Sequence, residues 1–363
     1  MSTDGPAISV NKVVTKERLY GKESRWRRNG APQPGSSSTD FGVFGPGSVA
    51  WEVLLHPASI VFQTSSQGLL QLTYKPILAG VRDWDPLSKK ARNGTLTIFD
   101  YFDRLQRNSG IHAPMWLGDR DTAQRVAKHL GNIHAKVAAD VIDCGAPELG
   151  GYAANSPRES MWAALTEMHS MLWIYESLAY RGFRRIGRLP ANLRDQFISE
   201  VSEYCRLFPA RDEQLPRTME DLKALYKRDE KLFGTSPTMP IIPETGQNFW
   251  ELLHATVKKN DHPSQWRVKL QLFFQNKVFA IPVQAAASHR TRQNMGMSPE
   301  QEAKVLARAR RMRPLIWLLQ RRPIANYFMR IMWGPDGSRL IESARKLHEE
   351  AKKEKGLRFA SPT

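Results

Sequence analysis

The sequence predicts an all-α fold, organised as a single multi-helix domain. Three observations support this prediction: apolar residues recur at helical spacing, proline and glycine separate these segments, and no sustained alternation of apolar and polar residues indicates strands. With 363 residues, 41% of them apolar, the chain can bury a large core. We expect the helical domain to cover residues 41–345, after a flexible, basic leader over 1–40 and before a tail over 346–363.

Prolines and capping side chains mark where the helices begin. Pro57, Pro157 and Pro190 each stand before a helical run, where the missing N–H of proline would have no partner in any case. Asp121 and Gln124 have the spacing of a capping box. The expected helices cover, in chain order, residues 48–55, 57–72, 97–106, 121–141, 157–180, 190–208, 218–232, 245–259, 265–280, 299–320 and 336–355.

Composition and motifs argue against several classes of protein. The longest stretch without formal charge, residues 53–74, contains histidine, proline, glutamine and serine, which indicates a buried helix rather than a membrane span. No apolar segment follows the basic N-terminal residues, so we expect no secretory signal. Cys144 and Cys205 are too few for a disulfide framework or a structural zinc site, and we expect a reducing, cytoplasmic location. The motifs G-x-S-x-G, G-x-G-x-x-G and H-E-x-x-H and the P-loop are absent, which disfavours hydrolases and kinases.

The positive charge is concentrated near the two ends of the chain. Of a net charge of +17, residues 12–28 carry +5 and residues 290–355 carry +9. These ends could dock on RNA or on an anionic membrane, or they could be solvated basic helices, and the residues leave both interpretations open. Around Trp317 and Trp333, basic residues flank two apolar stretches. This pattern fits an interfacial helix, or ordinary docking onto the domain with an exposed basic face.

His134 lies on the apolar face of the helix expected from Asp121. The residues of this face follow one another at steps of 4, 3, 4 and 4 and comprise Val126, Leu130, Ile133, Val137 and Val141. A buried imidazole needs a partner, because leaving it unsatisfied costs about 1–3 kcal/mol. Spacing alone therefore favours a hydrogen-bonded core histidine over a metal or haem ligand.

Four short segments occur in order along the chain. They are Phe44-Gly-Pro-Gly-Ser-Val-Ala-Trp51, Arg104-Leu-Gln-Arg107-Asn-Ser109, Gly131-Asn-Ile-His134-Ala-Lys-Val137, and Tyr152-Ala-Ala-Asn155-Ser-Pro157 followed by Trp162. This series resembles the opening signature, the R-x-x-K/R-T motif, the V-H-A-x-V segment and the Y-x-A-N-D-P segment of the rubber oxygenase (latex-clearing protein) and fungal endoplasmic-reticulum oxygenase family. The resemblance covers roughly residues 41–235, and the C-terminal third matches only in its helical, basic character.

The resemblance implies that the helical domain encloses a pocket for haem b, with iron held from one side by His134. Arg104 would lie on the oxygen-binding side, where its guanidinium could donate hydrogen bonds to dioxygen. Arg107 stands where related proteins can have a lysine that reaches the iron, but a protonated arginine cannot coordinate. Asn108 replaces the threonine of the motif. Arg104, Arg107 and Asn108 are thus the candidate catalytic residues, and His134 and Arg104 the candidate cofactor-binding residues.

One further departure concerns the run Trp-Val-His-Ala-Thr of many family members. This chain reads Trp162-Ala-Ala-Leu-Thr166, with Ala164 at the histidine position. We expect His169, on a different helix face, to be a core or capping residue rather than a replacement.

We therefore predict an oxidoreductase, a haem b-dependent oxygenase that acts with dioxygen on an apolar unsaturated substrate and makes peripheral membrane contact. One alternative is a non-catalytic haem sensor or carrier. The other is a cofactor-free helical protein that binds RNA or anionic membranes, with nucleic acid the less favoured partner.

Overall fold

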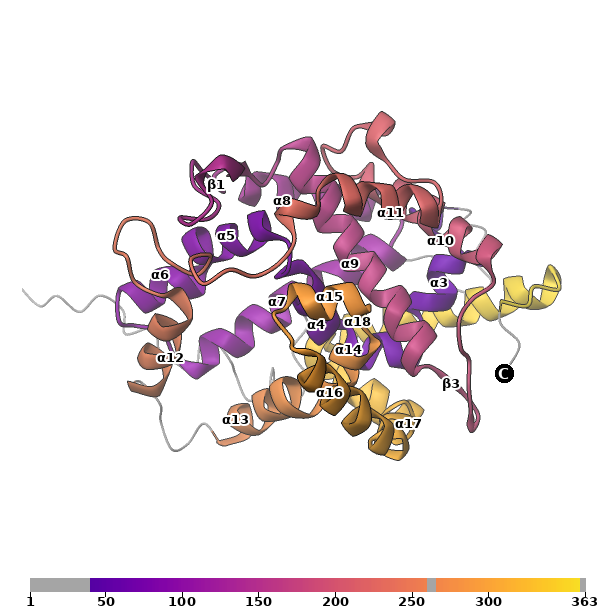
Figure 1. The fold of residues 1–363 in the computed structure, drawn as a ribbon. Coiled ribbons are helices and arrows are strands. Elements are labelled where there is room, and N and C mark those ends of the chain that lie inside the picture. Colours follow the sequence, from indigo (N-terminus) through magenta and orange to yellow (C-terminus); the bar gives the residue numbers. More distant parts are fainter. Residues whose placement is uncertain (1–39, 260–265, 360–363) are drawn as a thin grey trace, which may run out of the picture.

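Helices make up nearly all of the regular structure in the computed structural model, which describes residues 40–259 and 266–359 (Figure 1). The predicted all-α, single-domain class is confirmed. The expected flexible leader over residues 1–40 lies, apart from Asp40, outside the described residues. The α-helices are α3 (Val49–Leu54), α4 (Pro57–Gln71), α5 (Lys75–Trp84), α6 (Pro86–Arg92), α7 (Ile98–Leu117), α8 (Arg120–His134), α9 (Pro157–Leu178), α10 (Ala191–Cys205), α11 (Met219–Arg228), α12 (Phe249–Lys259), α13 (Trp266–Phe273), α14 (Ala280–Ala286), α15 (His289–Asn294), α16 (Pro299–Arg311), α17 (Arg313–Leu319) and α18 (Arg322–Glu354).

Short elements connect these helices. Two antiparallel hairpins of two-residue strands occur, one pairing Ala138 with Ala153 and the other pairing Tyr180 with Arg185. The strands are β1 (Ala138–Ala139), β2 (Tyr152–Ala153), β3 (Tyr180–Arg181) and β4 (Arg184–Arg185). The other short helical elements of the described residues are the 3-10 helices η1 (Pro147–Leu149), η2 (Asp212–Gln214) and η3 (Glu230–Leu232) and the π-helical turn η5 (Phe274–Val278).

The central helix is α9. It begins where the Ser156 side chain accepts a hydrogen bond from the backbone N–H of Glu159, with Pro157 in the first turn. It is buried on nearly every face, which is typical of a helix in the middle of a core. Helices α3, α4, α10 and α14 all pack against it. One large apolar cluster, the main core, therefore joins segments from residue 49 to residue 359.

A second apolar cluster lies apart from the main core, under α12. This satellite cluster consists of Ala91, Leu96, Ile242, Phe249 and Leu253. It packs α12 against α6, at the left in Figure 1.

Several helix boundaries differ from those predicted. Helix α7 continues beyond residue 106 to Leu117, and α5 and α6 were not expected. The expected helix over 121–141 begins earlier, with Asp119 as its N-cap, and ends at His134. It ends there because tertiary contacts redirect the chain: the Asn155 side chain donates to the Gly131 carbonyl, and the N–H of Ala154 donates to the carbonyl of Val137.

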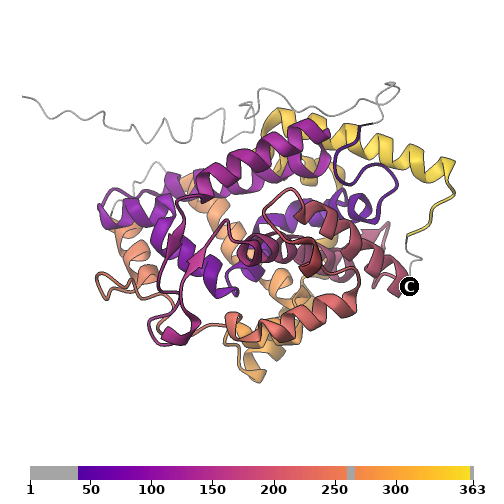
Figure 2. The ribbon, with the colours of Figure 1, turned by 90° about the horizontal axis from the view of Figure 1, so that it is seen from above.

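The C-terminal region is more continuous than predicted. The expected helix over 336–355 is the second half of α18, which starts at Arg322 and is interrupted by Gly334, whose φ of +72° favours glycine (Figure 2). Trp333 is buried and donates to the Ser109 hydroxyl on α7, so this tryptophan is a core residue and not part of an interfacial helix. Residue 345, the expected domain boundary, falls inside α18, and both His348 and Lys352 contact Glu52 of α3.

Of the helices that the structure describes, none combines the length and apolarity needed to cross a bilayer. Both cysteines are free; Cys144 is exposed and Cys205 is buried.

Candidate functional site

A cavity of about 470 Å³ lies between α4, α5, α7, α8, α9 and α12. Its volume is in the range of small-molecule and cofactor sites. Most of its wall is apolar, and this part includes Leu72, Ile77, Val81, Trp84, Ile111, Met115, Leu130, Val137, Phe208, Trp250 and Leu253. A few polar side chains interrupt this wall, among them Arg104, Asn108, His112, His134 and Glu167. A mostly apolar cavity with few polar groups is typical of a site for an apolar ligand held in one orientation.

Helix α7 supplies three of the polar groups, because Arg104, Asn108 and His112 follow one another at steps of four and so share one helix face. The guanidinium of Arg104 donates from Nε to Asp85 Oδ2 at 2.6 Å and from Nη1 to Asn108 Oδ1 at 3.2 Å. Asp85 is itself fixed as the N-cap of α6, since its side chain accepts from the N–H of Leu87. The guanidinium is therefore held at the cavity wall from two directions.

His134 is the last residue of α8, and its ring is half-buried at the cavity wall. Burial, followed by the positive charge of Arg104, lowers the pKa of this imidazole, so the ring is neutral at physiological pH. Within the described part of the chain, no hydrogen bond or ion pair involves its ring nitrogens. The ring is thus available as a ligand, because metal coordination requires a neutral, unprotonated nitrogen.

The apolar face of α8 is exposed more than we predicted. Ile133 is 51% exposed, and Val126 and Leu130 are only partly buried. Val126, Leu130 and Val137 pack against the main core, whereas Ile133 does not, so the face is only partly buried. The face borders the cavity, and it also borders a neighbouring groove.

This groove, with a volume of about 820 Å³, lies between α7 and α8. Arg104, Asn108 and His134 line both depressions. Arg107 lines only the groove; it is 61% exposed and pairs with Asp103 at 2.6 Å. Of the four predicted site residues, the structure thus brings Arg104, Asn108 and His134 to one cavity and leaves Arg107 outside it.

A hydrogen-bonded pair, His112 and Glu167, forms another part of the cavity wall and is nearly inaccessible to solvent. The two side chains meet at 3.0 Å between His112 Nε2 and Glu167 Oε2. The amide nitrogen of Gln63 donates to His112 Nδ1 at 3.3 Å, so the proton of a neutral ring lies on Nε2 and points to Glu167. Trp116 Nε1 and the hydroxyl of Tyr204 also donate to Glu167, at 2.9 and 3.1 Å. This network fixes one carboxylate beside an apolar cavity.

Sequence reasoning missed His112, Glu167 and Asp85. His112 could have been found from its spacing, because it stands two helical steps of four after Arg104, but the predicted helix ended at residue 106. Asp85 and Glu167 give no local signal, since their roles depend on which helices pack together.

Ala164 and His169 lie in different surroundings. Ala164 lines the cavity one turn before Glu167. His169 lies away from the cavity, where Trp173 Nε1 donates to its Nε2 and its Nδ1 meets the hydroxyl of Tyr226. Burial lowers the pKa of His169 to about 3. His169 is a satisfied core histidine, as predicted.

An all-α domain with an apolar cavity, an anchored arginine on its wall and a histidine that has no hydrogen-bond partner among the described residues suits a helical cofactor-binding or oxygenase domain. The family described as "ER-bound oxygenase mpaB/B'/Rubber oxygenase, catalytic domain" matches residues 51–334, and the chain belongs to this family. The match reaches about a hundred residues beyond residue 235, the end of the segment in which we recognised motifs, so residues 236–334 are also part of the family domain. No curated protein and no solved structure matches the chain.

Proposed function

We propose that this protein is a haem b-dependent oxygenase that oxidises an apolar, unsaturated substrate with dioxygen. The observation that carries the proposal is the neutral imidazole of His134 at the wall of an apolar cavity, without a hydrogen-bond partner in residues 40–259 and 266–359, in a chain of an oxygenase family. A cytoplasmic location belongs to the same proposal, and subcellular fractionation tests it.

The donor set supports a haem rather than a bare metal ion. Within the described residues, no group of three or more His, Cys, Asp or Glu side chains could hold a metal. A single imidazole is sufficient when a porphyrin supplies the other ligands, and the apolar cavity suits the porphyrin faces. The basic side chains of Arg107 and Arg125 line the adjoining groove and suit the carboxylates of a haem.

Each polar residue of the cavity has a role in this proposal. Haem, when bound, supplies the activation of dioxygen. His134 would hold its iron from one side, and Arg104 would donate a hydrogen bond to an oxygen atom on which negative charge develops. Asp85 and Asn108 would keep the Arg104 guanidinium in place, so that it need not reorient when the negative charge develops. Arg107 has no lone pair to offer to iron and lies outside the cavity.

The remaining cavity wall would hold the substrate and exclude water. The apolar side chains favour an apolar chain over a polar one, because its surface leaves water on binding. His112 would hold a proton on Nε2 beside Glu167, which gives the apolar cavity a second fixed polar position besides Arg104. A polar group on the substrate or product would be oriented there.

Haem content tests the ligand assignment. Protein produced with sufficient iron should contain about one b-type haem per chain in a pyridine haemochrome assay, bound without covalent attachment, because the C-x-x-C-H motif is absent. His134→Ala should lose the haem, whereas His169→Ala, a change at a buried histidine outside the cavity, should retain it. Circular dichroism checks that both variants fold. Full haem content and an unchanged absorption spectrum in His134→Ala would show that another residue is the ligand.

Turnover separates an oxygenase from a haem sensor or carrier. The holoprotein, given dioxygen and an unsaturated isoprenoid, should consume dioxygen and form carbonyl products. A haem-containing protein that leaves all tested alkenes unchanged would favour the sensor or carrier.

A further inference from the structure

The tip of the hairpin between β3 and β4 is an exposed and firmly held aromatic cluster. Phe183 is 82% exposed, yet its ring stacks on that of Trp317, with centroids 5.0 Å apart and an interplanar angle of 17°. The Arg321 guanidinium lies 3.6 Å from the centre of the Trp317 ring. Trp317 Nε1 and Arg321 Nη2 both donate to the carbonyl of Gly182, at 2.8 and 3.0 Å. The hairpin tip is therefore fixed to α17 and α18 while Phe183 stays in water.

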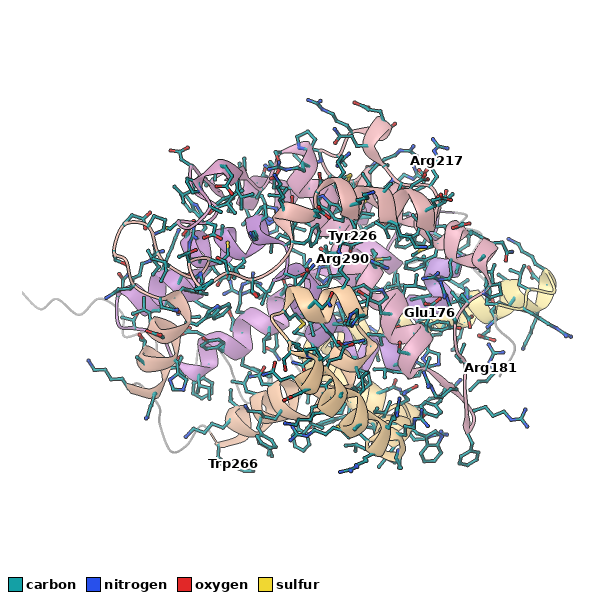
Figure 3. All side chains as sticks on the ribbon, in the orientation of Figure 1. Glu176, Arg181, Arg217, Tyr226, Trp266 and Arg290 are labelled. Carbon is teal, nitrogen blue, oxygen red and sulfur yellow. The ribbon has the colours of Figure 1, made fainter. Side chains whose placement is uncertain are left out.

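Aliphatic side chains of α17 continue this exposed apolar surface. Leu315 and Leu318 are three residues apart and therefore lie on the same side of the helix, with exposed fractions of 37% and 45%. Figure 1 shows α16, α17 and α13 along one edge of the molecule, which the β3–β4 hairpin also reaches. Trp266 of α13, labelled in Figure 3, lies at this edge and is 57% exposed. One flat surface could touch all of these elements together.

The same elements carry a strong excess of positive charge, and the acidic residues of α16, Glu300 and Glu302, lie in its first turn. Between Glu176 and Asp195 the chain has no acidic residue and five arginines, namely Arg181, Arg184, Arg185, Arg188 and Arg194. Between Glu302 and Asp336 it again has no acidic residue and eight basic ones, namely Lys304, Arg308, Arg310, Arg311, Arg313, Arg321, Arg322 and Arg330. Such a surface attracts an anionic partner over a distance of about a Debye length.

We propose that the β3–β4 hairpin and α17 form a docking surface for an anionic lipid bilayer. Phe183, Leu315 and Leu318 would enter the apolar boundary of the bilayer, and the arginines of α16 and α17 would lie at the phosphate level. Lipid is favoured over RNA because exposed leucines offer a base no stacking partner, and because the exposed ring of Phe183 already stacks on Trp317. This surface does not depend on haem or on the identity of the substrate.

Vesicle flotation tests the docking surface. The full chain should float with vesicles of phosphatidylcholine and phosphatidylserine and bind more weakly to vesicles of phosphatidylcholine alone. Neutralising Arg310, Arg311 and Arg313 to Gln together should weaken partitioning to the anionic vesicles roughly a hundredfold, from the contribution expected per basic residue at such a surface. Arg321 is left unchanged because it holds the hairpin.

The apolar part is tested by a second variant, with Phe183, Leu315 and Leu318 all replaced by Ser. These side chains are exposed, so the midpoint of thermal unfolding should stay near that of the parent. Vesicle binding should fall although all basic residues are retained. The matched control removes three charges from another edge of the molecule, where Figure 3 labels Arg217: Arg211→Gln, Arg217→Gln and Lys223→Gln. The control should bind vesicles like the parent.

Three results would overturn the proposal. The first is a parent protein that does not float with anionic vesicles. The second is a control variant that loses as much vesicle binding as the arginine variant does, which would show that only the net charge of the protein matters. The third is tighter binding of the parent to RNA than to vesicles in a gel-shift assay, with selective loss of RNA binding in the arginine variant. The haem spectrum, recorded on the same samples, reports separately on the proposed function.

Discussion

Replacing Glu52 with Gln should destabilise the protein in a pH-dependent way. Glu52 is buried on α3, and its carboxylate accepts hydrogen bonds from the Tyr175 hydroxyl at 2.9 Å, Lys352 Nζ at 2.9 Å and His348 Nε2 at 3.2 Å. The N–H of Gly47 donates to His348 Nδ1, which leaves the ring proton on Nε2 and directs it to Glu52. Burial raises the pKa of Glu52, but the hydrogen bonds from His348 and Lys352 outweigh burial and hold the pKa at about 2.

The magnitude follows from this pKa. The difference between the ordinary value of 4.5 and about 2 corresponds to about 3 kcal/mol of folding free energy. Because the folded-state pKa is the lower one, this stabilisation is complete above about pH 5 and disappears as the pH falls toward 2. At about pH 3, less than half of it should remain. Glu52→Gln should therefore cost about 3 kcal/mol at neutral pH and much less at pH 3.

Urea unfolding, followed by circular dichroism at both pH values, measures this difference. Glu349→Gln is the matched control: Glu349 also pairs with Lys352, at 3.0 Å, but its side chain is 60% exposed, so its loss should cost no more than about 0.5 kcal/mol. An equal loss of stability at both pH values in Glu52→Gln would show that packing, and not the charge, accounts for the effect. A loss below about 1 kcal/mol at neutral pH would refute the reasoning altogether.

Two further predictions concern the cavity. Arg104→Ala should retain haem, but the reduced holoprotein should be oxidised in air of the order of a hundredfold faster, because a preorganised donor is lost; Arg217→Ala, an exposed change away from the cavity and the groove, should stay near the parent rate. An oxidation rate unchanged in Arg104→Ala would leave its guanidinium a purely structural group. His112→Ala should lower the free energy of unfolding by about 1–3 kcal/mol because Glu167 loses a buried donor, and His112→Gln should recover part of this loss. Equal stability of both variants and the parent in urea unfolding would contradict that role.

Helix starts were easier to predict than helix ends, because starts depend on local side chains. Pro57 and Pro157 stand in the first turns of α4 and α9, as the sequence indicated, and the helix expected from residue 48 begins directly after its N-cap, Ser48. The end of α8 depends instead on Asn155, whose side chain bonds the Gly131 carbonyl from a segment more than twenty residues further along the chain. Apolar spacing continues past His134 into the β1 hairpin, so periodicity alone could not show where the helix stops.

The candidate site was predictable only in part, for a related reason. The resemblance pointed to His134, Arg104 and Asn108, and these three residues line one cavity. It could not show that Asp85 anchors Arg104, because that contact needs α6 to pack against α7. Likewise, the hydrogen bond between His112 and Glu167 joins α7 to α9. The spacing of residues within one helix cannot predict a contact between two helices.

Because α12 packs on the satellite cluster, the walls of the cavity differ in how easily they can move. The walls formed by α4, α9 and the C-terminal half of α7 belong to the main core and can move only if much of the domain unfolds. Trp250 and Leu253, on the opposite wall, are carried by a helix whose apolar contacts are mainly with a few residues around α6. Moving α12 away from α6 requires only the free energy of a local unfolding event, which is smaller than the free energy of unfolding the whole domain. Substitutions in α12 are therefore expected to change the width of the cavity at Trp250 and Leu253, while the wall formed by α4 and α9 keeps its shape.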